Sequence, residues 1–138
     1  MSDSAQDDQA RHSLLLIDDV ESVLRVLSRG LVLLGFNVHT ASSRSAAVEL
    51  AKQERYSLVL LDIQMPGLSL SETMLSIRAA QADTPILLMT GGADPAVVDH
   101  GLALGGIGPV WKPISIPDLN KRICGILDRK GIKDSGQS

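Results

Sequence analysis

Aromatic residues and cysteines are almost absent from this chain of 138 residues, which has one each of Phe, Tyr, Trp and Cys. A core must therefore be built from aliphatic side chains, and the apolar fraction of 44% can supply them. The single cysteine, Cys124, excludes an internal disulfide and a site of several metal-bound thiolates. A reducing cytoplasm is accordingly the simplest compartment, and we expect a cytoplasmic protein.

Long apolar runs and basic clusters are also missing. No run approaches the roughly 20 apolar residues that a membrane span requires, and the opening MSDSAQDDQA lacks the apolar core of a secretory signal. The formal charge is −3, and the Lys and Arg residues are scattered. Surfaces for nucleic acid or anionic lipid need clustered basic residues, so we expect neither partner.

The length fits one domain that can bury a core. We expect the folded unit to span residues 13–128, with residues 1–12 and 129–138 as disordered polar tails that are too short for an effector domain. The initial Met1 and the polar tail favour a stand-alone protein, although one domain of a longer protein stays open.

Short apolar runs alternate with longer segments of helical spacing. Leu14–Ile17, Leu58–Leu61 and Ile86–Met89 are typical of strands buried on both faces, although such runs do not exclude buried helix. Asn37–Ala41 and Val110–Trp111 are weaker strand candidates.

Five segments between and after these runs have the spacing or the caps of helices. Asp94 followed by Pro95 is a typical helix start, and a serine at position 43 is another N-cap candidate. Five successive βα units predict a parallel sheet with helices on both faces. The predicted helices are Val20–Leu34, Ser43–Glu54, Ser71–Ala80, Pro95–Leu104 and Pro117–Leu127.

Polar residues stand where the predicted strands end, namely Asp18, Asp19, Asp62, Thr90 and Lys112. Ligands of open α/β sheets bind at the carboxyl ends of the strands, so we expect these side chains to converge. Crowded carboxylates repel one another and need a compensating cation, and Mg²⁺ prefers such oxygen ligands. Asp62 could then attack a phosphoryl donor to give an acyl phosphate, with Lys112 and Mg²⁺ neutralising charge.

Each of these residues also has a simpler explanation. Asp18 and Asp19 could cap the first helix, Thr90 could cap a strand end, and Lys112 could be a solvated charge. Only their joint occurrence, in order and at successive strand ends, favours a site.

Four motifs resemble the receiver domains of bacterial response regulators: LLLIDDV at 14–20, LVLLDIQMPG at 58–67, PILLMTGG at 85–92 and WKP at 111–113. The resemblance covers residues 13–128. It implies a flavodoxin-like (βα)5 fold, a doubly wound parallel five-stranded α/β sheet of order 2-1-3-4-5.

The resemblance also implies roles for single residues. Asp62 would be the phosphoacceptor, Lys112 would pair with the phosphoryl group, and Thr90 would move toward it. Pro113 would follow a cis peptide bond that orients Lys112, and Met65-Pro66-Gly67 would shape the loop after the acceptor. The ligands of Mg²⁺ would be Asp18, Asp19, Asp62 and the backbone carbonyl of Gln64.

The implied phosphodonor is a histidine kinase or a histidine phosphotransfer protein. The implied output is phosphorylation-dependent binding of a downstream protein, or onward phosphorelay. The binding surface would be the face of the fourth helix, fifth strand and fifth helix (residues 95–104, 110–111 and 117–127). Gln64 and Gly92 would flank the water that removes the phosphoryl group, and we expect this loss to be slow to moderate.

Three positions depart from the pattern of the family. Pro109 stands where an aromatic residue usually reports the movement of the threonine, which puts ordinary output coupling in doubt. Leu70 stands near a usual glycine, so we expect the loop to run differently. Trp111 replaces a smaller residue, and we favour a core position for its ring over a partner surface.

Two other functions stay open. Pro109 would suit a pseudo-receiver, a protein-interaction module with a vestigial site. A metal-dependent phosphatase or other hydrolase is disfavoured because Gln64 stands where a second acid is expected.

Overall fold

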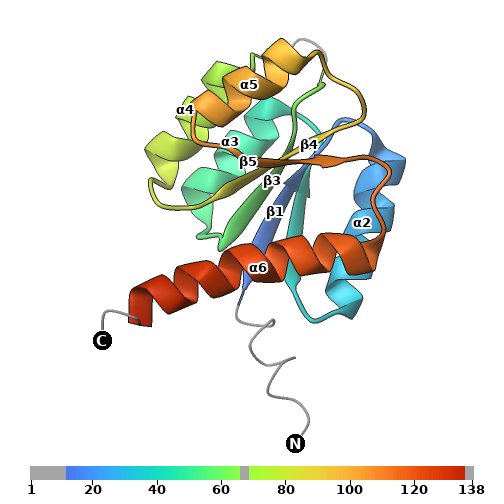
Figure 1. Cartoon of the computed structure of the whole chain (residues 1–138), viewed down its shortest axis with the longest axis vertical. Helices are drawn as coiled ribbons and strands as arrows, with labels where there is room; N and C mark the ends of the chain where they lie inside the picture. Colours follow the sequence, from blue (N-terminus) through green and yellow to red (C-terminus); the bar gives the residue numbers. More distant parts are fainter. Residues whose placement is uncertain (1–11, 66–68, 136–138) are drawn as a thin grey trace, which may run out of the picture.

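The structure, a computed structural model, describes residues 12–65 and 69–135, with side chains described through Arg129. Strands and helices alternate along the described chain (Figure 1). The elements are β1 Ser13–Ile17, α2 Glu21–Leu33, β2 Asn37–Ala41, α3 Arg44–Gln53, β3 Leu58–Asp62, α4 Leu70–Ala80, β4 Ile86–Thr90, α5 Pro95–Ala103, β5 Ile107–Trp111 and α6 Ile116–Ser135.

The five strands form one parallel sheet in the order β2-β1-β3-β4-β5, which confirms the predicted flavodoxin-like fold. Helices α2 and α6 cover one face, and α3, α4 and α5 cover the other (Figure 1). Successive strand residues alternate between these faces: Leu14 and Leu16 pack with the first layer, whereas Leu15 and Ile17 pack with the second. The aliphatic runs are therefore buried on both sides, as predicted.

Four of the helices begin at a side-chain cap, among them α6, where the backbone N–H of Asp118 donates to Ser115 Oγ at 3.2 Å. Ser43 and Asp94, both predicted, accept hydrogen bonds from the backbone N–H groups of Ala46 and Ala96 at 3.2 and 2.8 Å. A third cap, Ser69, was not predicted and places the start of α4 at Leu70. Among the described residues, no helix combines the length and apolar character needed to cross a membrane.

Two predicted boundaries are wrong. Helix α6 continues to Ser135, whereas the sequence predicted a helix that ends at Leu127. The segment after Leu127 contains no proline, and its one glycine costs a helix only about 1 kcal/mol. Strand β5 begins at Ile107 rather than Val110, because a bulge lies between its first and last pairs with β4.

The bulge in β5 contains Gly108 and Pro109. Leu87 pairs with Ile107 and Met89 pairs with Val110, so β5 has one residue more than β4 in this interval. Gly108 has φ +112°, and a Cβ there would lie 3.2 Å from the carbonyl oxygen of Leu88. β5 is an edge strand, where a proline removes no needed ladder donor.

The side chain of Gln81 links the layer of α3 and α4 to the start of β3 through hydrogen bonds. Its side chain is buried, and its Nε2 donates to the carbonyl oxygens of Ala51 and Glu54 at 2.9 and 2.7 Å. Its Oε1 accepts from the Tyr56 backbone N–H at 3.0 Å and from the Thr84 hydroxyl at 2.9 Å. One carboxamide thus satisfies four polar groups.

We expect Gln81→Leu to lower the free energy of unfolding by on the order of 3 kcal/mol, because each buried group left without a partner costs about 1–3 kcal/mol. The measurement is the urea midpoint. Gln53→Leu, at an exposed position on α3, is the matched control and should change little. Equal midpoints for the two variants would contradict this role of Gln81.

Candidate functional site

Three carboxylates meet at the carboxyl edge of the sheet. Asp18 follows β1 and Asp62 ends β3, and because Ile17 and Leu61 are paired in register, the two acids are neighbours. Asp18, Asp19 and Asp62 each offer a carboxylate oxygen, and these oxygens lie within 4.8 Å of one another. Asp18 and Asp62 are buried and Asp19 is exposed. The predicted convergence of these acids is present.

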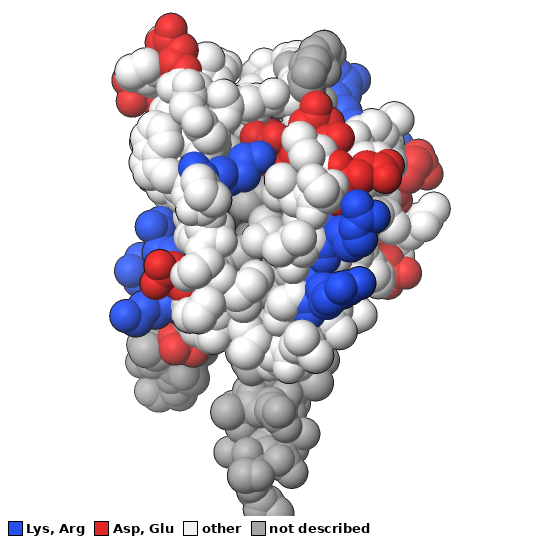
Figure 2. All heavy atoms as spheres, turned by 90° about the vertical axis from the view of Figure 1, so that its right-hand side faces the viewer, with Lys and Arg blue, Asp and Glu red and all other residues white. Residues whose placement is uncertain are grey.

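Lys112 supplies the positive charge of the cluster. Its Nζ lies 2.7 Å from Asp18 Oδ2 and 3.4 Å from Asp62 Oδ2. The backbone holds it there, since the N–H of Lys112 donates to the carbonyl oxygen of Thr90 at 2.7 Å. The peptide bond to Pro113 is cis, as the resemblance implied. Figure 2 faces the side of α2 and shows acidic and basic atoms side by side in its upper part.

The surroundings alter the pKa of two of these groups. Burial raises the pKa of Asp62, and the nearby charge of Asp18 adds to the rise, whereas the Gln64 N–H and Lys112 oppose it. Burial alone would lower the pKa of Lys112, but its hydrogen bond to Asp18 and the charge of Asp62 outweigh burial and raise it. Lys112 therefore stays charged, and one ammonium faces two buried acids.

The donor set fits a hard divalent cation. All three side chains offer carboxylate oxygens, two of them from buried residues, and Mg²⁺ binds such oxygens while keeping several waters. Asp62 is oriented on one side by the Gln64 backbone N–H, which donates to its Oδ1 at 3.0 Å. The backbone carbonyl of Gln64 as a further ligand remains a prediction.

Thr90, the last residue of β4, is buried and fully hydrogen-bonded. Its oxygen accepts from the backbone N–H groups of Gly92 and Ala93 at 3.1 and 2.8 Å. Its hydroxyl donates to Gln64 Oε1 at 3.1 Å, and that oxygen also accepts from the N–H of Gly91. The sequence analysis did not predict this Gln64–Thr90 contact, which joins the loops after β3 and β4.

The expected core position of Trp111 is wrong, because its side chain is 56% exposed. It ends β5, the edge strand of the sheet that the described residues form. Trp111 is paired in register with Thr90, so the two residues are cross-strand neighbours. An exposed indole thus lies beside the threonine of the site.

Other predictions concern positions that follow β3 and β4. Leu70 is the first residue of α4, and its buried side chain packs against α5 at Gly101. Gly92 has φ +139°, and a side chain there would meet no atom within 4 Å. Pro66 and Gly67, predicted to shape the loop after Asp62, lie outside the described residues.

A hollow of about 470 Å³ opens beside the acidic cluster. It lies between α2 and the segment after β5, and Lys112 lines it together with Val23, Val26, Pro113 and Ile114. Val26 is largely exposed. An apolar surface therefore continues directly from the charged site.

Known proteins are similar to this chain in sequence and in fold. The family model described as "Response regulator receiver domain" matches residues 14–124. "Probable transcriptional regulatory protein TcrX" of Mycobacterium tuberculosis is 34% identical over 128 residues, which are 90% of this chain and 54% of that protein. This chain spans about half the length of the curated relatives YkoG, TcrX and ycf27 of Cyanidium caldarium.

Solved structures share the whole architecture. A CheY-like receiver domain protein from Methanospirillum hungatei superimposes with a TM-score of 0.83 at 22% identity, over 88% of this chain and 98% of that chain. Chemotaxis protein CheY4 of Vibrio cholerae gives a TM-score of 0.75 at 28% identity, over 81% of this chain and 95% of that chain.

Proposed function

Because this chain belongs to the response regulator receiver domain family, we propose that Asp62 accepts a phosphoryl group from a phosphohistidine in a Mg²⁺-dependent reaction. Receiver domains are phosphoryl-accepting signalling domains rather than conventional enzymes, and they interact with histidine kinases or phosphotransfer proteins. The observation that carries the proposal is the buried Asp62 carboxylate, which lies beside Asp18 and Lys112 and has a raised pKa.

In the proposed reaction a carboxylate oxygen of Asp62 attacks the phosphorus atom. An O–P bond forms, the P–N bond to the donor histidine breaks, and its electron pair stays on the imidazole nitrogen. Lys112 neutralises developing charge and needs little movement, since its Nζ is already 3.4 Å from Asp62. Asp18, Asp19, Asp62 and the Gln64 carbonyl would hold Mg²⁺, which supplies further positive charge to the phosphoryl oxygens.

The donor has to cover the carboxyl edge of the sheet to bring its histidine to Asp62. The apolar hollow beside Lys112 is continuous with this edge and is lined by Val23 and Val26 of α2. Burying such a surface excludes water from the site and favours association. We therefore assign the hollow to the donor, either a histidine kinase or a histidine phosphotransfer protein.

The output surface in this proposal is the face of α5, β5 and α6. Thr90 moves toward the phosphoryl group, and its cross-strand neighbour Trp111 is exposed on this edge. Val97 and Leu102 of α5 are partly exposed as well. A downstream protein would bind here, or the phosphoryl group would pass on to a phosphotransfer protein, in the cytoplasm.

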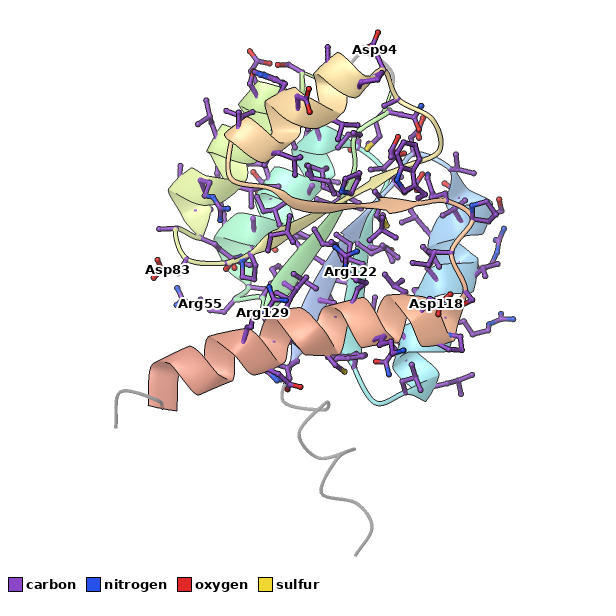
Figure 3. The ribbon with its side chains drawn as sticks, in the orientation of Figure 1. Arg55, Asp83, Asp94, Asp118, Arg122 and Arg129 are labelled. Atoms are coloured by element: carbon purple, nitrogen blue, oxygen red, sulfur yellow. The ribbon has the colours of Figure 1, made fainter. Side chains whose placement is uncertain are left out.

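The test is the intact mass of the protein after incubation with acetyl phosphate and Mg²⁺. We expect a gain of one phosphoryl group, and no gain when EDTA removes Mg²⁺. Asp83→Asn is the matched control for acid variants, because Asp83 is exposed at the opposite end of β4 from Asp94 and from the site (Figure 3).

The outcomes separate the alternatives. A chain that neither gains phosphate nor binds the phosphoryl mimic beryllofluoride would be a pseudo-receiver, an interaction module with Pro109 in its β5 bulge. Release of phosphate from small phosphoesters over many turnovers would instead indicate a hydrolase.

A further inference from the structure

The side chain of Gln64 bridges the two loops that flank the site. Its Oε1 accepts hydrogen bonds from the Thr90 hydroxyl, 3.1 Å away, and from the backbone N–H of Gly91. The backbone N–H of Gln64 donates to Asp62 Oδ1 at 3.0 Å. One residue thus contacts both the proposed phosphoacceptor and the hydroxyl proposed to bind its phosphoryl group.

The hydroxyl of Thr90 has no capacity left for a second acceptor. Its oxygen already accepts two hydrogen bonds, from the N–H groups of Gly92 and Ala93. A hydroxyl carries one donor hydrogen, and in this structure that hydrogen goes to Gln64. A phosphoryl oxygen can receive it only after the Gln64–Thr90 hydrogen bond breaks.

We infer that Gln64 is a positioning residue that holds Thr90 in its unphosphorylated arrangement and competes with the phosphoryl group for its hydroxyl hydrogen. The inference rests on the proposed function of Asp62. It goes further by naming Gln64 as the group that opposes the movement of Thr90 toward the phosphoryl group. Gln64 and Gly91 are both exposed, so water can satisfy them once the contact opens. The restraint is therefore about as strong as one net hydrogen bond.

The test is a titration with beryllofluoride and Mg²⁺, followed by the fluorescence of Trp111, the only tryptophan in the chain. Gln64→Met keeps the length of the side chain and removes its strong acceptor. We expect this variant to bind beryllofluoride about 2- to 10-fold more tightly than the wild type, the equivalent of one net hydrogen bond. Because beryllofluoride is not hydrolysed, a role of Gln64 in orienting water cannot produce this change.

The same substitution in a Thr90→Val protein distinguishes competition for the Thr90 hydroxyl from a general effect of Gln64→Met on the loop. Thr90→Val keeps the shape of the side chain but has no hydroxyl, so adding Gln64→Met to it should leave the affinity unchanged. Gln53→Met, at an exposed position of α3, is the matched control in wild-type background.

Unchanged binding in Gln64→Met, or an equal gain in the Thr90→Val background, would overturn the inference while leaving the proposed function intact. A wild-type chain that does not bind beryllofluoride would overturn both.

Discussion

Replacing Asp62 by asparagine is expected to abolish phosphoryl incorporation and, at neutral pH, to make the protein more stable. The first effect follows because a carboxamide cannot take the place of the attacking carboxylate. The second follows from the charges of the site: two buried acids, Asp18 and Asp62, face the single ammonium of Lys112. Asp62→Asn removes the surplus negative charge while Lys112 keeps its 2.7 Å hydrogen bond to Asp18.

The raised pKa of Asp62 predicts how this gain in stability depends on pH. The pKa of Asp62 is raised in the folded state, chiefly by burial. Between the unfolded and folded pKa values the folded protein therefore binds more protons, and wild-type stability falls as pH rises through that range. The stability advantage of Asp62→Asn should grow through this range and then level off. Below the ordinary carboxyl pKa of about 4 it should vanish.

Intact mass after phosphodonor treatment measures the loss of phosphoryl incorporation. Urea unfolding measures the stability effect, between pH 3 and pH 8, a range chosen to span this interval. We expect the urea midpoint of Asp62→Asn to lie above that of the wild type at neutral pH. Asp83→Asn, the exposed control, should still be phosphorylated and should show no comparable advantage. Continued incorporation in Asp62→Asn would assign the phosphoryl group to another residue, and a loss of stability at neutral pH would contradict the electrostatic account.

Replacing Lys112 by methionine is expected to have the opposite effect on stability. It removes the ammonium that lies beside the buried Asp18 and Asp62, and breaking a buried ion pair costs about 3–5 kcal/mol. Because the Lys112 side chain is 18% exposed, we expect the low end of this range. Phosphorylation by acetyl phosphate should slow by about 100-fold, the usual cost of removing one preorganised charge or donor from a reaction centre.

Mg²⁺ distinguishes this electrostatic loss from a simple packing defect. A cation bound to the acids of the site stabilises the folded state by mass action, and it should do so more in Lys112→Met, where the carboxylates lack their ammonium. The urea midpoint of the variant should therefore rise more with Mg²⁺ than that of the wild type. Lys52→Met, exposed on α3, is the matched control.

The double variant gives a further check, since Asp62→Asn should recover part of the stability that Lys112→Met loses. Strictly additive effects, together with an equal response to Mg²⁺ in variant and wild type, would mean that Lys112 does not compensate these acids.

The sequence by itself determined the architecture and which residues come together at the site. Short aliphatic runs alternate with helical segments, and such a pattern has few packed solutions. In a parallel sheet the carboxyl ends of the strands share one edge. Asp18, Asp62 and Lys112 could therefore be brought together from their positions after strands, without any knowledge of side-chain packing.

Only the tertiary structure decided the contacts that depend on how loops and edges pack. The Gln64–Thr90 hydrogen bond joins residues 26 apart, and the Gln81–Tyr56 bond joins residues 25 apart. The sequence singled out Gln64 for its backbone carbonyl and for the attacking water but not for a contact with Thr90, and Gln81 reads there as an ordinary polar residue. Trp111 was assigned to the core because its apolar character is visible in the sequence, whereas the place of β5 at the edge of the described sheet is not. Local pattern predicts which face a residue takes, but its partners depend on segments that meet only after folding.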